Sequence, residues 1–319
     1  MTVRNSLMGF FRSSLFRVIV LGLALVAAIW AIAKNWAEVR QALQALPLWL
    51  NGVEVVLAFV YVFLTMVSWR FVLNDVGSRI PPHVARRIFF SSQVAKYLPG
   101  GVWNFVAAAE IGRDYEISRR RSISALVVSI VISIVTGMIL ALIAVVLSPS
   151  QKLSDLAWLG VAIPIGVVVL MPPVLNRLVN MALRILKREP LEDEMSWSGT
   201  FWAAFWAFMG WLVVGFQLWL MLINLGMTVS VSTFLLSVGG YALSWTAGFL
   251  VFFVPAGVGV REVTLGAILS SLVNSGSVVV VVLLIRVFTT IADIGLGVSA
   301  SIAMRRCVGP KDSSEPSHR

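Results

Sequence analysis

Long uninterrupted runs of apolar residues dominate the chain, and they predict helices that cross a membrane. An α-helix needs about 20 mostly apolar residues to span the hydrocarbon core of a bilayer. About six full transmembrane helices are predicted, over residues 18–33, 48–73, 122–147, 156–171, 201–225 and 278–304. The pattern therefore predicts an all-α polytopic membrane protein.

Two further apolar segments are interrupted by glycine and proline. Residues 88–111 contain Pro99-Gly100-Gly101, and residues 232–272 contain Pro255-Ala-Gly257-Val-Gly259. A backbone that leaves helical geometry at membrane depth must be buried in protein or line a wet cavity. We therefore predict two broken or re-entrant helical hairpins. Two kinked transmembrane helices without a binding site are the alternative, and residues 232–254 are long enough to span.

The order of these elements predicts a possible inverted repeat within a single membrane domain, residues 1–319. The first pseudo-repeat, residues 15–147, and the second, residues 156–304, each contain two spans, a broken hairpin and a final span. The first begins inside and the second begins outside. Interrupted segments at corresponding positions of two halves are the best sequence indication of a transporter's binding site. Such repeats place the substrate near the bilayer midplane.

The distribution of charge orients these elements. The chain is 59% hydrophobic and 13% charged, which is too apolar for a soluble domain. Its formal charge is +10, and most of its 25 Lys and Arg residues fall at one predicted membrane face. This positive-inside pattern predicts a cytoplasmic N-terminus and a cytoplasmic tail at residues 305–319. We place the chain in the plasma (inner) membrane of a prokaryote as a hypothesis. It also favours anionic lipid head groups over nucleic acid.

The N-terminal apolar run has a second interpretation. Ala31-Ile32-Ala33 resembles the small-residue cleavage site of a secretory signal peptide. The run is long for such a peptide and many spans follow it, so we favour a retained first span.

Composition argues against a metal, a cofactor or nucleotide hydrolysis. One cysteine and two histidines are too few and too scattered for a metal site. No Walker A motif is present, and Glu262 stands where a dinucleotide fingerprint that begins at Gly257 requires a third glycine. We interpret one acidic cluster as a solvated loop rather than a metal site: Glu189, Glu192, Asp193 and Glu194.

Residues 174–188 predict an amphipathic helix on the cytoplasmic surface. Its apolar face and its basic face are formed by two sets at helical spacing: Leu175, Leu178, Ala182 and Ile185 on one side, and Arg177, Arg184 and Arg188 on the other.

Two cations lie beside the helix breaks, at predicted membrane depth. Lys96 precedes the first break and Arg261 follows the second. Each break also begins a new half-helix, whose N-terminus offers unpaired N–H groups and partial positive charge to an anion. The sequence thus predicts a phosphate site between the two hairpins. Its proposed substrate-binding residues are Lys96, Pro99, Gly100, Gly101, Trp103, Asn104, Pro255, Gly257, Gly259 and Arg261.

A second set of deep charges has two interpretations. Arg286 and Asp293 are seven positions apart, so they share one face of the last span. They form structural ion pairs to neighbouring helices, or Asp293 and Glu262 carry protons for coupling. Glu110 lies close to the cytoplasmic exit and is expected to pair with Arg113 or Lys96. Glu54, in the second span, either reaches the outer interface or faces the protein interior.

Two segments carry a resemblance to a known family. They are Ser92-Gln-Val-Ala-Lys-Tyr-Leu-Pro-Gly-Gly-Val-Trp103 and Pro255-Ala-Gly-Val-Gly-Val-Arg-Glu262. The chain resembles the lysylphosphatidylglycerol synthase transmembrane region, or flippase-like membrane domain, over nearly its whole length. The resemblance implies a flippase-type fold and the movement of lipid-linked anions between leaflets. It also implies a functional link to a glycosyltransferase or lipid synthase, to which relatives are fused. This chain ends without a soluble domain, so synthase activity is not expected of it.

Taken together, these features predict a flippase rather than an enzyme. It would move an anionic phospholipid or a polyprenyl-phosphate-linked sugar, with the head group at the midplane between two broken helices. The alternatives are an integral-membrane enzyme acting on a lipid phosphate or glycosyl carrier, and a non-transporting partner of a glycosyltransferase.

Overall fold

A computed structural model describes residues 36–97, 103–147, 156–185, 187, 189–251, 259–269 and 272–307. The predicted first span at residues 18–33 lies outside the described residues. So do the centres of both breaks, residues 98–102 and 252–258, and the tail beyond residue 307. Five predicted binding residues therefore have no structural account: Pro99, Gly100, Gly101, Pro255 and Gly257.

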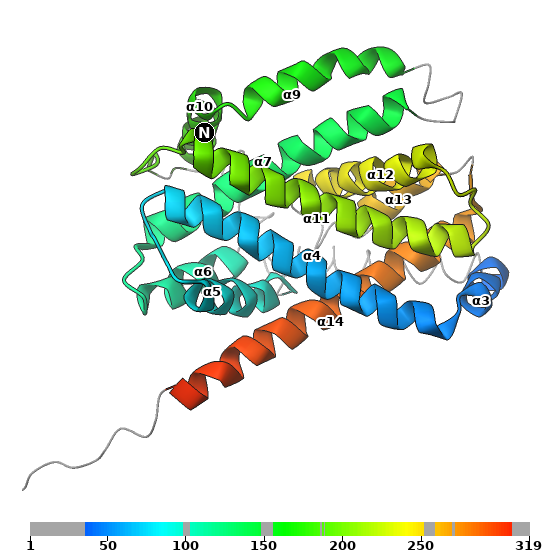
Figure 1. Cartoon of the computed structure of the whole chain (residues 1–319), viewed down its shortest axis with the longest axis horizontal. Coiled ribbons are helices and arrows are strands. Elements are labelled where there is room, and N and C mark those ends of the chain that lie inside the picture. Colours follow the sequence, from blue (N-terminus) through cyan, green and yellow to red (C-terminus); the bar gives the residue numbers. More distant parts are fainter. Residues whose placement is uncertain are drawn as a thin grey trace, which may run out of the picture.

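The described residues form helices and no strand, as predicted (Figure 1). Five helices are apolar and long enough to cross a bilayer, and a bent helix pair adds at most one more span within the described part of the chain. The five are α4 (Leu48–Asp75), α7 (Arg119–Val146), α11 (Trp197–Asn224), α12 (Val231–Leu250) and α14 (Ser275–Cys307). The all-α polytopic prediction is confirmed.

Shorter helices connect and interrupt these spans. Outside the two breaks they are α3 (Trp36–Ala45), η2 (Ala157–Ala162), α9 (Ile163–Val169) and α10 (Pro172–Ile185). The first broken segment contains α5 (Pro82–Val94), η1 (Ala95–Tyr97) and α6 (Trp103–Arg113), and the second contains α12 and α13 (Val260–Leu269). Described helical segments thus flank both predicted breaks.

Local sequence explains where several helices begin. The Ser118 hydroxyl accepts a hydrogen bond from the Arg121 N–H at the start of α7, and the Ser196 hydroxyl accepts one from the Gly199 N–H at the start of α11. Ser230 forms a capping box with Thr233 at the start of α12. Such caps satisfy N–H groups that the first helical turn leaves unpaired.

The spans pack as a bundle in which glycine permits close approach. α4 lies beside α11, and α12 lies beside both α7 and α11 (Figure 1). A Cβ at Gly215 would lie 2.5 Å from the Val238 Cα, and one at Gly239 would lie 2.8 Å from the Leu140 carbonyl oxygen. Small residues at such contacts are how membrane helices gain packing without a hydrophobic driving force.

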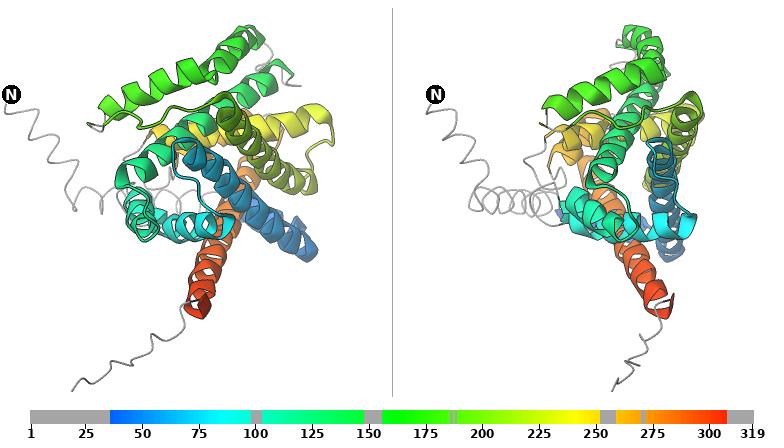
Figure 2. Two further views of the ribbon diagram at one scale, coloured as in Figure 1. Left: turned by 60° about the vertical axis from the view of Figure 1, so that its left-hand side comes forward. Right: turned by 90° about the vertical axis from the view of Figure 1, so that its left-hand side faces the viewer.

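The bundle has two ends that differ in composition. We call one the arginine-rich end: it contains the C-terminus of α4, helices α5 and α6, and the N-terminus of α7 (Figure 1). At the opposite end lie α3 and the turn between α11 and α12. The C-terminal part of α14 extends away from the bundle (Figure 2).

The bent pair corresponds to the predicted fourth span, residues 156–171, and to the predicted surface helix. The segment Trp158–Val169 meets α10 at an angle of 87°, and Pro172 opens α10. Arg177 and Arg184 are exposed on α10, as predicted. Ile185, expected on the apolar face, is 74% exposed, whereas Leu175 of the same face is buried. The side of α10 that packs against the protein contains Leu175, Asn176, Val179 and Leu183.

Candidate functional site

Helix α14 joins the two broken segments through ion pairs. The Lys96 Nζ, in η1, lies 2.7 Å from the Asp293 Oδ2, and the Asp293 side chain is 1% exposed. The Arg286 Nη2 lies 3.2 Å from the Oε1 of Glu262, which belongs to the first turn of α13. The two α14 residues are about 10 Å apart along the helix. Residues from both breaks are therefore brought to one face of one helix.

We call this group the polar centre and define it by six residues: Lys96, Tyr97, Arg261, Glu262, Arg286 and Asp293. Of the two interpretations of Arg286 and Asp293, the structure shows the ion pairs to neighbouring elements.

Glu262 also caps its own helix. Its Oε2 accepts a hydrogen bond of 2.6 Å from the N–H of Gly259, and Gly259 has a φ of +85°. Glycine reaches this backbone region at little cost, and a carboxylate at a helix N-terminus is electrostatically favourable. The sequence predicted that the free N–H groups at the start of α13 bind a substrate anion. One of these groups, the Gly259 N–H, already donates its hydrogen bond to Glu262.

Arg261 is held by an aromatic ring instead of an acid. Its guanidinium carbon lies 5.8 Å from the centre of the Trp245 ring, and Phe249 stacks on Trp245 at 5.4 Å. Among the described residues Arg261 has no ion pair, and its buried Nε has no hydrogen-bond partner. A cation over an indole face is attracted by the ring quadrupole, but its charge is not neutralised. That charge remains available to an anion.

Tyrosines surround the charges, and sequence reasoning missed them. The chain has four tyrosines. The Tyr97 hydroxyl donates a 2.6 Å hydrogen bond to the Asp293 Oδ2, and Tyr61 and Tyr241 each interact electrostatically with Arg261 and Asp293. The sequence signal that could have pointed to them was the rarity of tyrosine. In the structure, three of the four tyrosines lie at the polar centre, and they come from different helices.

The remaining predicted residues lie at the ends of α6. Trp103 and Asn104 open the helix, and Trp103 is 41% exposed. Glu110, near its end, lies 2.7 Å from the Arg119 guanidinium and 3.3 Å from that of Arg113. The expected pairing with Arg113 is confirmed, whereas the alternative partner Lys96 pairs with Asp293 instead. Hydrogen bonding, chiefly from Arg119, lowers the pKa of Glu110 below its ordinary value.

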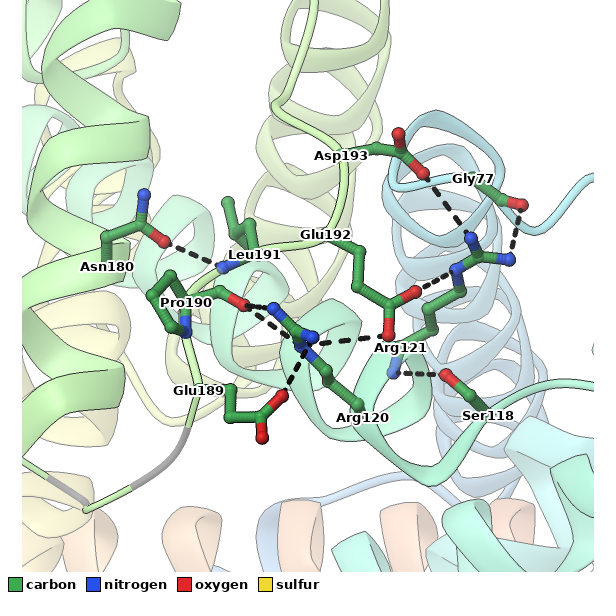
Figure 3. A network of polar contacts seen from close by, with 10 residues as sticks. All are labelled: Gly77, Ser118, Arg120, Arg121, Asn180, Glu189, Pro190, Leu191, Glu192 and Asp193. Carbon is green, nitrogen blue, oxygen red and sulfur yellow. Dashed lines mark hydrogen bonds and ion pairs between the residues drawn. The ribbon is translucent and has the colours of Figure 1, made fainter.

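The acidic loop, residues 189–194, has exposed acidic side chains, as predicted, and it also forms ion pairs. Arg120 lies 2.8 Å from Glu189, and Arg121 lies 2.6 Å from Glu192 (Figure 3). Arg121 also donates a 3.1 Å hydrogen bond to the Gly77 carbonyl. This arginine network links the α4–α5 turn, the start of α7 and the loop before α11. Its partners lie about 70 positions apart in sequence, so no local spacing pointed to it.

Glu54 faces the protein interior, which decides between its two predicted placements. Its side chain is 0% exposed, and the Gln217 side chain of α11 donates a 3.0 Å hydrogen bond to the Glu54 backbone carbonyl.

Comparison with known proteins agrees with this membrane architecture. A family model described as "Lysylphosphatidylglycerol synthase TM region" matches residues 18–297. The chain belongs to this family. It is therefore a multi-pass membrane protein of a lipid-handling family, as its sequence motifs predicted. No curated protein matches the chain.

In this family member, the polar centre carries a net positive charge. Three cations (Lys96, Arg261 and Arg286) and two carboxylates (Glu262 and Asp293) leave an excess of one positive charge when all are ionised. An excess charge in a low-dielectric site is costly unless a counter-ion enters. The arrangement is suited to a ligand with one negative charge, such as a phosphodiester.

Proposed function

We propose that the protein is a lipid flippase, which moves an anionic phospholipid or a polyprenyl-phosphate-linked sugar between leaflets. The head group would bind at the polar centre, and the tails would remain in the bilayer. The observation that carries the proposal is Arg261: a deep cation without an ion pair in the described structure, placed beside two ion pairs that connect both broken segments to α14.

The ion pairs suggest how binding leads to movement. In the empty site, Asp293 compensates Lys96 and Glu262 compensates Arg286. An incoming phosphate first meets Arg261 and then competes with these carboxylates for their cations, because charge-assisted contacts to phosphate are strong. Lys96, 35% exposed, is accessible for this exchange. Weakening either pair loosens a broken segment from α14, so that the two halves rock and expose the site to the other side.

We also propose an orientation of the protein in the membrane and the kind of cell in which it acts. The arginine-rich end would face the cytoplasm of a prokaryotic cell, by the positive-inside rule, with both termini on that side. No catalytic step is assigned to the chain. A separate glycosyltransferase or lipid synthase would supply or consume the lipid.

Transport by purified protein in sealed liposomes tests this function. Labelled phosphatidylglycerol, lysyl-phosphatidylglycerol and a short polyprenyl-phosphate sugar are compared in the wild type and in Arg261→Ala. We expect one lipid class to be transported and the rate to fall at least about tenfold in the variant, since losing a buried charge contact exceeds 1.4 kcal/mol.

Arg177→Ala is the matched control, because Arg177 is exposed on α10; it should transport at the wild-type rate. A folded Arg261→Ala protein that transports as fast as the wild type would overturn the site, and a wild type inactive with all three lipids would overturn the function.

A further inference from the structure

Glu54 is a fully buried carboxyl group that the polar centre does not use. It lies in α4, about 9 Å from the start of that helix at Leu48. Its side chain is 0% exposed, and neither carboxyl oxygen has a hydrogen-bond partner among the described residues. Gln217, on the facing helix α11, is also 0% exposed, and its Oε1 has no such partner either.

The charged groups on neighbouring helices do not compensate Glu54. α4 packs against α5, α7, α11 and α14. α11 contains no ionisable side chain, and the basic residues of α5 and α7 belong to the arginine-rich end, as do Arg70 and Asp75 of α4 itself. α14 contributes Arg286 and Asp293, which are engaged with Glu262 and Lys96. Glu54 has no ion pair among the described residues, and Gln217 is the polar side chain that acts on it.

An unpaired carboxylate in such surroundings is strongly disfavoured. Its ionised form would lose hydration without gaining a cation, and the Gln217 side chain offsets only part of this cost, so the group takes up a proton instead. The neutral acid can donate its O–H to the unpartnered Gln217 oxygen. Glu262 and Asp293 differ from Glu54, because each has an ion-pair partner, Arg286 and Lys96 respectively.

We propose that Glu54 is the proton-carrying site that couples lipid movement to a proton gradient. This inference rests on the proposed function. Glu54 would hold a proton while it is buried against Gln217 and release it as the carboxylate when movement of α4 relative to α11 admits water. No other bond forms or breaks. α4 and α11 belong to different predicted pseudo-repeats, so rocking of the halves would change the burial of this group directly.

Helix α4 also connects Glu54 to the polar centre. Tyr61 lies seven positions further along, two turns away on the same face and about 10 Å distant. Tyr61 interacts electrostatically with Arg261 and Asp293. A change of charge at Glu54 therefore acts on the element that borders the lipid head-group site, from the side opposite to the arginine-rich end.

Infrared spectroscopy tests the protonation without any lipid substrate. Protein in liposomes near neutral pH should show the C=O stretch of a protonated carboxyl group, shifted when glutamate is labelled with ¹³C. The band should be missing in Glu54→Gln and present in Glu110→Gln, whose carboxyl group is exposed and ion-paired. A wild type without a ¹³C-sensitive band would overturn the proposal, whether or not the variants fold.

Transport measurements test the coupling. A pH gradient should accelerate lipid movement several-fold in the wild type, whereas Glu54→Gln should give the same rate with and without the gradient and retain downhill exchange. An undiminished response in the variant would overturn the coupling role while the flippase function stands. If the wild type moved no lipid, the function would fail, and the infrared band would then report a protonated group with no transport to couple.

Discussion

At the scale of single residues, opposite charges at the polar centre depend on one another. The Asp293 Oδ2 accepts hydrogen bonds from both Lys96 and Tyr97, and its Oδ1 has no partner among the described residues. A buried carboxylate that loses its cation is left uncompensated, which is more costly than losing the whole pair. The pair therefore constrains the first broken segment, in addition to its proposed role in binding.

Lys96→Ala should accordingly destabilise the protein by about 3 kcal/mol, the lower end of the range for broken buried pairs because Lys96 is partly exposed. Adding Asp293→Asn should restore a large part of the loss by removing the unpaired charge. Denaturation in detergent, analysed as a double-mutant cycle, checks this. Additive effects of the two changes would show that the two side chains do not interact.

Glu110, at the arginine-rich end, makes a pH-dependent contribution to the stability of the folded protein. Its pKa is lowered by Arg119 and, less strongly, by Arg113. The ionised pair therefore adds stability above the unfolded pKa of glutamate, about 4.3, and this stability is lost as the pH falls through the lower folded pKa. Unfolding of wild type and Glu110→Gln should differ at pH 7 and converge in acid. The effect is small because the pair is exposed, and a difference that grows in acid would contradict it.

At the scale of helices, glycine positions decide how closely the spans approach. Gly215→Ala should destabilise the protein by about 1–3 kcal/mol, because the new methyl group would meet the Val238 backbone and force α11 and α12 apart. Gly52→Ala in α4 is the matched control: nothing lies within 4 Å of its added Cβ. It should stabilise the helix by about 0.5–1 kcal/mol. Unfolding of both variants in detergent measures the contrast, and equal effects would exclude close packing as the cause.

The positions of the helices were more predictable from the sequence than the contacts between them. The apolar runs located α4, α7, α11 and α14 within a few residues, because burial in lipid requires a continuous run of apolar residues. Proline and glycine predict the breaks for a similar local reason, and the centres of both breaks lie outside the described residues. Ion pairs such as Lys96–Asp293 join residues far apart in the sequence, and spacing along one helix contains no information about them. The side of α10 that packs against the protein was not predicted, because its neighbours and not its periodicity set that side. The inverted repeat remains a prediction.

At the scale of the whole molecule, the arginine network connects parts of both predicted halves. Arg120 and Arg121 begin the last span of the first half, and the acidic loop precedes α11 in the second (Figure 3). Asp75, at the end of α4, adds a link, because its carboxylate accepts hydrogen bonds from the Ser196 N–H and hydroxyl. Rocking of the halves would have to rearrange these contacts. The network thus stabilises the arrangement of helices that the structure shows at the arginine-rich end.

Reversing one charge of this network should loosen that end without unfolding the bundle. In Arg121→Glu, the new carboxylate would repel Glu192 and lose the hydrogen bond to the Gly77 carbonyl. Amide hydrogen exchange in residues 189–195 should then accelerate, while exchange in the centre of α11 stays unchanged, because local opening does not require global unfolding. The double variant Arg121→Glu/Glu192→Arg should slow loop exchange again by restoring opposite charges. Since the side chains are about one-third exposed, high salt should weaken both effects. Unchanged loop exchange in a folded Arg121→Glu protein would show that the halves are held together elsewhere.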